Sequence, residues 1–120
     1  YCSAMGRAML AYMSQAEVQK VLRASELQKL TPETKIDLRE INQELIHTRQ
    51  KGYCILFDEL AESKSSLAAP IFDRNRNPVA AISVSASAQS LSQPQREREL
   101  AKAVMTAAGK ISGKLGYYPK

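Results

Sequence analysis

Two serines separated by a single residue mark the segment of this chain best suited to binding chemistry. Residues 78–86 alternate apolar and small polar side chains as a strand does, and Ser83 and Ser85 fall on the face opposite the apolar one. A buried hydroxyl without a hydrogen-bond partner costs about 1–3 kcal/mol. Two serines side by side on a strand therefore indicate that a ligand or another polar group meets them there.

A second strand brings a third serine to the same face. Residues 66–72 and 79–86 are separated by a turn-rich segment and should form a hairpin. The antiparallel register that we expect gives three pairs: Phe72 with Val79, Ala68 with Ser83, and Ser66 with Ser85. Three serines would then form a polar floor for a ligand. The alternative is that these serines bond to neighbouring main chain or water at a solvated edge.

The beginning of the first predicted helix offers a further candidate site. Ala4, Met5 and Gly6 carry small or flexible side chains, so the amides of the first turn can approach an anion. Amides and serine hydroxyls together suit a carboxylate better than a metal ion or a phosphate chain. The alternative here is that the glycine only eases helix packing.

The elements that would position these residues follow from hydrophobic periodicity and capping patterns. We expect helices at 3–13, 14–24 and 37–51, strands at 53–59, 66–72 and 79–86, and a long helix at 92–115. Ser14 with Glu17 and Asp37 with Glu40 form capping boxes, and Gly52 ends the third helix. The predicted fold class is α+β, with helices covering one face of a three-stranded antiparallel sheet.

The apolar residues of the last predicted helix recur at helical spacing and should form a stripe along one side. This stripe consists of Leu100, Val104, Ala107, Ala108, Ile111 and Leu115.

The first and second predicted strands are joined by a linker, residues 60–65, that is longer than a tight turn.

The composition is that of an ordinary soluble domain. The chain has 120 residues, 44% of them hydrophobic and 24% charged. The net charge is +5, but the basic residues alternate with polar and acidic ones, so this segment is not expected to read DNA itself. Cys2 and Cys54 are too few and too far apart for a disulfide framework or a zinc site. We expect free thiols, a cytoplasmic location and no contact with a membrane.

The residues that usually carry catalysis or bind metal do not form a set. His47 is the only histidine, and Asp58 and Glu59 are adjacent on a predicted strand, so they should point to opposite faces. A serine nucleophile needs an activating base, and no Gly-x-Ser-x-Gly elbow is present. We predict no catalytic residues, no metal site and no cofactor.

Several segments match a known family in order and spacing. They are residues 2–11 (CSAMGRAMLA), 30–34 (LTPET), 49–53 (RQKGY), 58–60 (DEL), 68–73 (AAPIFD), 79–85 (VAAISVS) and 111–117 (ISGKLGY). This set resembles the C-terminal effector-binding domain of the IclR family of bacterial transcription regulators. The resemblance covers essentially the whole chain.

The resemblance implies a GAF-like domain with a curved antiparallel sheet. Residues 1–120 would form the later two-thirds of the effector-binding domain, with the helix-turn-helix DNA-binding domain and the first strands upstream. Family members hold a small carboxylate effector through main-chain amides, which here fall at Ala4 and Met5. They also use two strand serines, which here fall at Ser83 and Ser85.

Two further effector contacts of the family differ in this sequence. One is often a cysteine and falls on Ser66, which keeps a hydrogen-bond donor. The other is commonly an aspartate and falls on Leu56, so the resemblance implies a more apolar site for an aromatic or alkyl acid. Residues 1–7 (YCSAMGR) are similar to the subgroup that governs protocatechuate, 4-hydroxybenzoate and β-ketoadipate catabolism.

The sequence therefore predicts a non-enzymatic sensor domain. It would bind a small carboxylate and control DNA binding allosterically within a homodimer or tetramer. Two alternatives stay open: a dimerisation module without its own ligand, whose last helix forms the interface, and a small hydrolase that uses Ser83 or Ser85 as its nucleophile.

Overall fold

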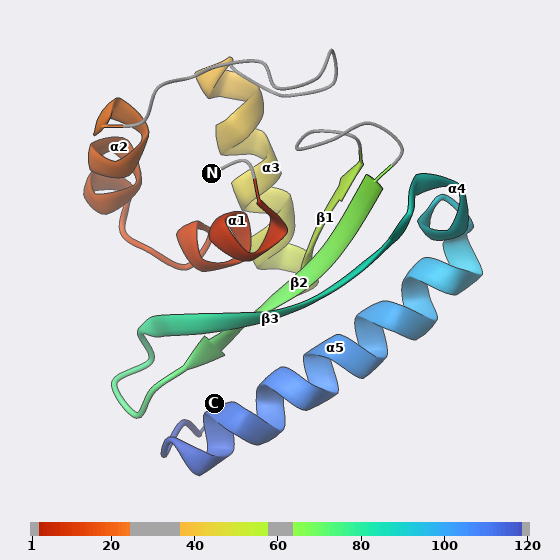
Figure 1. Cartoon of the computed structure of the whole chain (residues 1–120). Helices are drawn as coiled ribbons and strands as arrows, with labels where there is room; N and C mark the ends of the chain where they lie inside the picture. The colour runs from red at the N-terminus through yellow and green to blue at the C-terminus, as the bar shows by residue number, and fades with distance from the viewer. Residues whose placement is uncertain (1–2, 25–36, 58–63, 119–120) are drawn as a thin grey trace.

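Helices and strands follow one another in nearly the predicted order. The computed structural model describes residues 3–24, 37–57 and 64–118. The elements are α1 (Ala4–Leu10), α2 (Gln15–Ala24), α3 (Leu38–Lys51), β1 (Cys54–Phe57), β2 (Lys64–Phe72), β3 (Pro78–Ser87), α4 (Ala88–Leu91) and α5 (Pro94–Lys114) (Figure 1). The fold is therefore α+β, as predicted. The predicted linker at 60–65 falls mostly outside the described residues, and its last two residues belong to β2.

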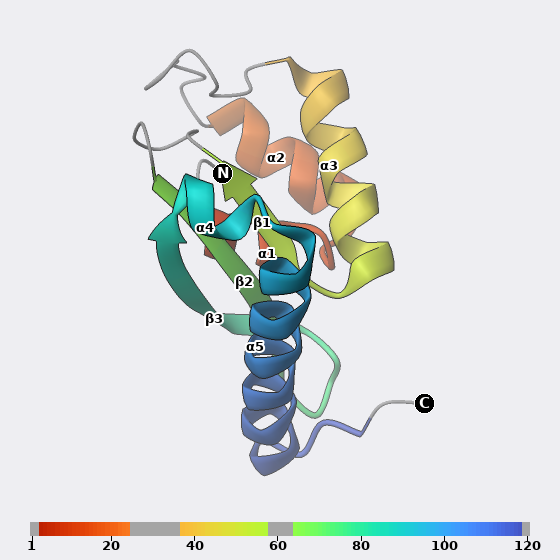
Figure 2. The same cartoon turned by 90° about the vertical axis from the view of Figure 1, so that its right-hand side faces the viewer.

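Helices cover both faces of the sheet, so the prediction of one covered face is wrong. The strands are antiparallel in the order β1-β2-β3. The central strand is buried continuously from Leu67 to Ile71, which requires a cover on each side. Leu67 packs in a cluster with α5, whereas the next residue, Ala68, packs in a cluster with α1. Figures 1 and 2 show α1 on one side of the sheet and α5 on the other.

The larger core lies between the sheet and α5. The apolar face predicted for β3 is confirmed, because its alternate residues, from Ala80 to Ala86, pack against this core. The predicted stripe of α5 is wrong at its end, where Ile111 and Leu115 are 39% and 44% exposed. Ser112 is buried there instead, and its hydroxyl oxygen accepts a hydrogen bond of 2.9 Å from the amide of Phe72. The amide of Phe72 needs a hydrogen-bond acceptor, and this requirement explains why a serine and not an apolar residue is buried at this position.

A second, smaller core joins three helices. Its buried residues come from the end of α1 and the turn after it, from α2 and from α3: Leu10, Ala11, Val18, Leu22, Ile41 and Leu45. No helix in the described ranges is long and apolar enough to cross a membrane.

The helix ends confirm most of the capping predictions. Ser14 and Glu17 form the capping box, with a bond of 3.2 Å from the Glu17 amide to the Ser14 hydroxyl and one of 2.9 Å between the side chains. Asp37 accepts a hydrogen bond of 2.8 Å from the amide of Arg39. The single-turn helix α4 was not predicted, because four residues are too few to show a helical period.

The hairpin register is confirmed at the serines and differs at the turn. Ala68 lies opposite Ser83 and Ser66 opposite Ser85, as expected. Phe72, however, lies opposite Pro78 and not Val79, because the register shifts between Ile71 and Phe72. The turn itself is held by the Asp73 carboxylate, which accepts bonds from the amides of Asn75 and Asn77 at 2.9 and 3.0 Å.

Gly52 is required where α3 ends. Its φ is +90°, and a Cβ added there would lie 3.2 Å from the Sδ of Met105 on α5. We expect Gly52→Ala to lower the free energy of unfolding by about 1–2 kcal/mol, because a left-handed conformation penalises a side chain. Gly109 lies within α5 in open space. Gly109→Ala should raise stability by about 0.5–1 kcal/mol. Urea unfolding measures the free energy of unfolding of both variants, which should fall for Gly52→Ala and rise for Gly109→Ala.

Tyr53, which follows the end of α3, forms a hydrogen bond to α5. Its hydroxyl donates a hydrogen bond of 2.5 Å to Oε2 of Glu97, and the Nζ of Lys51 lies 5.1 Å from the centre of its ring. Burial, together with this hydrogen bond and the negative charge of Glu97, raises the pKa of Tyr53 to about 12.

A raised pKa means that the folded protein holds the Tyr53 proton more tightly than the unfolded chain does. The stabilisation is present below pH 10 and is lost as the pH rises towards the folded pKa of about 12. We therefore expect Tyr53→Phe to unfold at a temperature that falls less steeply over this range than that of the parent protein. Thermal unfolding followed by circular dichroism at several alkaline pH values measures it, and parallel curves would contradict the assignment.

Candidate functional site

Side chains on the α1 face of the sheet form two rows across the three strands. Strand pairing places these residues opposite one another in the order β1, β2, β3: Leu56, Ser66 and Ser85 in the first row, and Cys54, Ala68 and Ser83 in the second. We call these the serine rows. Both rows are apolar on β1 and carry a hydroxyl on β3. A ligand lying along them would meet a hydrocarbon surface at one end and hydroxyl groups at the other.

The two hydroxyls of the first row are within hydrogen-bond distance. The Oγ atoms of Ser66 and Ser85 are 3.3 Å apart, and either can be the donor. One bond between two hydroxyls leaves one hydrogen and several lone pairs available. Ser66 is half-buried, whereas Ser83 and Ser85 are exposed. The structure thus brings Ser66 and Ser85 into contact and places Ser83 in the adjacent row on the same face.

The amides at the start of α1 are divided between a cap and open positions. The hydroxyl oxygen of Ser3 accepts a hydrogen bond of 2.9 Å from the amide of Gly6. Within the described ranges the amides of Ala4 and Met5 have no such partner, as is usual in the first turn of a helix. Of the three amides predicted to meet an anion, those of Ala4 and Met5 are therefore available, and that of Gly6 is occupied by the cap. A role of Gly6 in a site stays a prediction.

Small residues let α1 lie close to the sheet beside the serine rows. Ala4 and Ala8 are buried in a cluster with Cys54, Leu56 and Ala68. Leu56 is only 5% exposed, so it lies under the helix as part of an apolar floor. The Cys54 side chain is buried as a thiol that is not in a disulfide, as predicted. The close approach brings the first amides of α1 over the same face as the serines.

Arg7 is the buried residue that sequence reasoning missed. Its side chain is fully buried within α1. The signal was its helical spacing, because Arg7 falls between Ala4 and Ala8 on the face that packs inward. A guanidinium group withdrawn from water must be paired and hydrogen-bonded, so this position is structurally demanding.

The other residues considered for chemistry do not join the serine rows. His47 is exposed on α3, and Asp58 and Glu59 lie outside the described residues. Within residues 3–24, 37–57 and 64–118, no group of three or more His, Cys, Asp or Glu side chains is arranged to hold a metal ion.

A family model decides the relationship of this chain to known proteins. The model described as "Bacterial transcriptional regulator IclR C-terminal" matches residues 1–113. The chain belongs to the IclR family. Its residues match the C-terminal domain of transcriptional regulators, and the prediction of a regulator domain instead of an enzyme is confirmed by this membership.

Curated relatives and a solved structure agree with this membership. The chain is 29% identical to the HTH-type transcriptional regulator KipR of Bacillus subtilis over 117 residues, which is 98% of this chain and 46% of KipR. It is 31% identical to the Pca regulon regulatory protein of Pseudomonas putida over 84 residues, or 70% of this chain and 29% of that protein. The crystal structure of Thermotoga maritima IclR matches with a TM-score of 0.93 and 32% identity, over 98% of this chain and 47% of that one. The chain thus spans less than half the length of these relatives.

The alanine contact beneath α1 can be tested by adding volume. We expect Ala8→Leu to lower the free energy of unfolding by about 1–3 kcal/mol, because a larger side chain has no space between α1 and the sheet. Ala16 is exposed on α2. Ala16→Leu should change stability by less than about 0.5 kcal/mol. Urea unfolding of both variants measures the difference, and equal stabilities would show that α1 does not pack through Ala8.

Proposed function

We propose that this domain binds a small carboxylate on the serine rows and so controls DNA binding by the regulator to which it belongs. The observation that supports this proposal most directly is the convergence of hydrogen-bond donors on one face. The paired hydroxyls of Ser66 and Ser85, the hydroxyl of Ser83 and the first amides of α1 all belong to the α1 face of the sheet.

The chemistry of these groups favours an anion with delocalised charge. Hydroxyls and amides are neutral donors, and the start of a helix adds a partial positive charge. The six side chains in the serine rows are three serines, a cysteine, a leucine and an alanine, which suit the single charge of a carboxylate better than a multiply charged phosphate. A carboxylate can accept from two or three such donors at once.

The apolar end of the serine rows supports an effector with a hydrocarbon body. Leu56, Cys54 and Ala68 form that end, and the family's usual acidic contact is replaced by Leu56. An aromatic or alkyl acid would place its body there. We further propose an aromatic acid of the protocatechuate or 4-hydroxybenzoate class, which agrees with the likeness to a Pca regulon regulatory protein.

Control of transcription requires the effector to favour one state of the regulator. A ligand that binds both states equally shifts no equilibrium, however tightly it binds. We propose that residues 1–120 form the later part of the effector-binding domain of a homodimeric or tetrameric cytoplasmic protein. DNA would be bound by a separate helix-turn-helix domain.

One observation favours a second candidate function, a dimerisation module. Ile111 and Leu115 are 39% and 44% exposed near the end of α5, on a helix whose other side covers the sheet. Two such faces could pack together between copies of the chain. A module of this kind would need no ligand, so ligand binding separates the two candidates.

Removing single hydroxyls tests the proposed site. We expect Ser83→Ala or Ser85→Ala to weaken carboxylate binding by about 1–2 kcal/mol, because each loses one hydrogen bond to a charged group. Thr106 is exposed on α5, outside the serine rows. Thr106→Ala should leave the affinity unchanged. Isothermal titration calorimetry measures these affinities, and equal values for all three variants and the parent would refute the site.

Thermal unfolding against a panel of carboxylates identifies the ligand class. The panel contains protocatechuate, 4-hydroxybenzoate, adipate and pyruvate. A ligand at about 100 times its Kd adds roughly 2.7 kcal/mol, which shifts the Tm of a domain of this size by several degrees. A shift that disappears in the Ser83→Ala, Ser85→Ala double variant supports a sensor, whereas a concentration-dependent Tm without any ligand effect supports the dimerisation module.

A further inference from the structure

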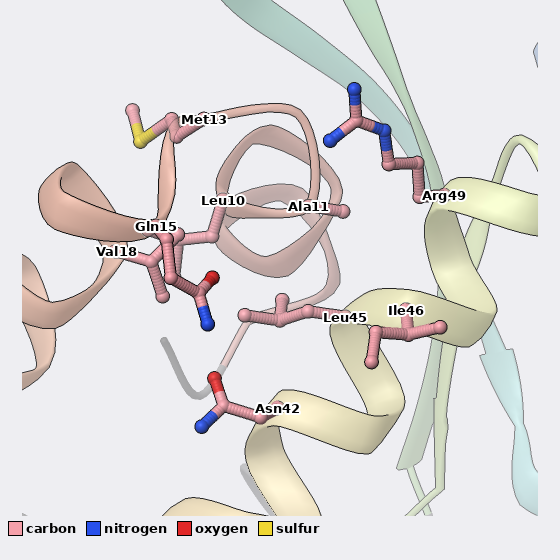
Figure 3. Close-up of a pocket in the computed structure, with 9 residues that line it drawn as sticks. All are labelled: Leu10, Ala11, Met13, Gln15, Val18, Asn42, Leu45, Ile46 and Arg49. Carbon is pink, nitrogen blue, oxygen red and sulfur yellow. The ribbon is translucent and has the colours of Figure 1, made fainter.

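A cleft separate from the serine rows opens in the second core. It lies between the end of α1, the beginning of α2 and one side of α3 from Asn42 to Arg49, and it holds a cavity of about 130 Å³ (Figure 3). Protein cavities of roughly 150 Å³ accommodate a benzene molecule. The cleft is slightly smaller than this and suits a short hydrocarbon chain.

The floor of the cleft is apolar and is already part of the protein core. Leu10, Val18 and Leu45 line it, and each is at most 6% exposed. Ile46 stands at the rim and is 57% exposed, a large aliphatic side chain in contact with water. Covering such a side chain removes apolar surface from water and is favourable.

Polar groups occupy the two ends of the cleft. The side-chain amides of Gln15 on α2 and Asn42 on α3 point towards each other at one end, and Arg49 lies at the other (Figure 3). The Cζ of Arg49 is 5.8 Å from the centre of the Tyr12 ring. Within the part of the chain that the structure describes, Arg49 forms no ion pair, and no acidic residue lines the cleft. The lining carries one formal positive charge and no negative one.

We infer that this cleft is a binding site for a small organic monoanion with a short hydrocarbon body. The carboxylate would pair with the guanidinium of Arg49, and the body would cover Leu45 and Ile46 on its way to the two amides. A single cation matches one carboxylate, whereas a cationic ligand would be repelled. The inference is independent of the serine rows, which pack against Ala4 and Ala8 of α1, whereas Leu10 and Ala11 line the cleft.

Hexanoate is a suitable probe, because its chain fits the cavity and its head carries one negative charge. We expect hexanoate to shift the ¹⁵N–¹H signals of Gln15, Leu45 and Arg49 in the labelled protein, with a Kd on the order of 1 mM for so small a ligand. Hexylammonium has the same chain length and the opposite charge, and it should leave these signals unchanged. Equal shifts with both probes, or hexanoate shifts confined to the serine rows, would overturn the inference.

Three variants separate the cleft from other basic or apolar surfaces. Arg49→Gln should raise the Kd of hexanoate about tenfold, the usual loss for one charge-assisted hydrogen bond. Arg98→Gln removes an exposed arginine of α5, outside the cleft, and should have no effect. Ile46→Ala should raise the Kd about threefold through lost apolar contact alone.

Unfolding curves of the same variants guard against indirect effects, because Arg49 also contacts Tyr12. If Arg49→Gln unfolds, Ile46→Ala still decides, since its side chain is mostly in solvent and its removal should be tolerated. Unchanged affinity in both variants would refute the site. The amide signals of Gln15, Leu45 and Arg49 report binding in the cleft, and those of Ser83 and Ser85 report binding on the serine rows. Each site is therefore measured separately, and failure of the cleft leaves the proposed effector site untouched.

Discussion

The close packing of α1 on the sheet is the contact on which both candidate ligand sites depend. Ala4 and Ala8 bring the helix against Cys54, Leu56 and Ala68. This packing places the first turn of α1 over the face of the sheet that carries the strand hydroxyls. The other end of the same helix forms a wall of the second core and of the cleft. A helix of seven residues thus connects two regions of different chemistry.

The burial of β2 restricts where polar chemistry can occur on the sheet. Both faces of this central strand are covered, so polar groups there must find partners within the protein, as the buried hydroxyl of Ser65 does with the carbonyls of Ala86 and Ser87 at 3.1 Å. On β3 the α1 face remains open to solvent at Ser83 and Ser85. Hydroxyls in that position remain available to a ligand, because water satisfies them when no ligand is bound.

The features that the sequence could predict are those that neighbouring residues specify. Strand alternation and a tight turn determine the pairing of Ser66 with Ser85, and local side-chain bonds determine the caps at Ser14 and Asp37. The covering of both sheet faces, the burial of Arg7 and the assembly of the cleft depend on how distant segments pack. No sequence pattern links the polar residues of the cleft, which are Gln15, Asn42 and Arg49. They come together only because α2 packs beside α3.

The alternation along β2 also restricts how a gene for this domain can change. Leu67 faces α5 and Ala68 faces α1, so neighbouring codons specify side chains for two different cores. From this strand, the core under α5 takes large side chains such as Leu67, and the one under α1 takes the small Ala68. Inserting or deleting one codon within the strand would turn the larger side chains towards α1, where only small ones fit. Evolution can therefore alter β2 by substitution but not by length. Insertions and deletions should instead accumulate in connections such as residues 73–77, where no such alternation must be preserved.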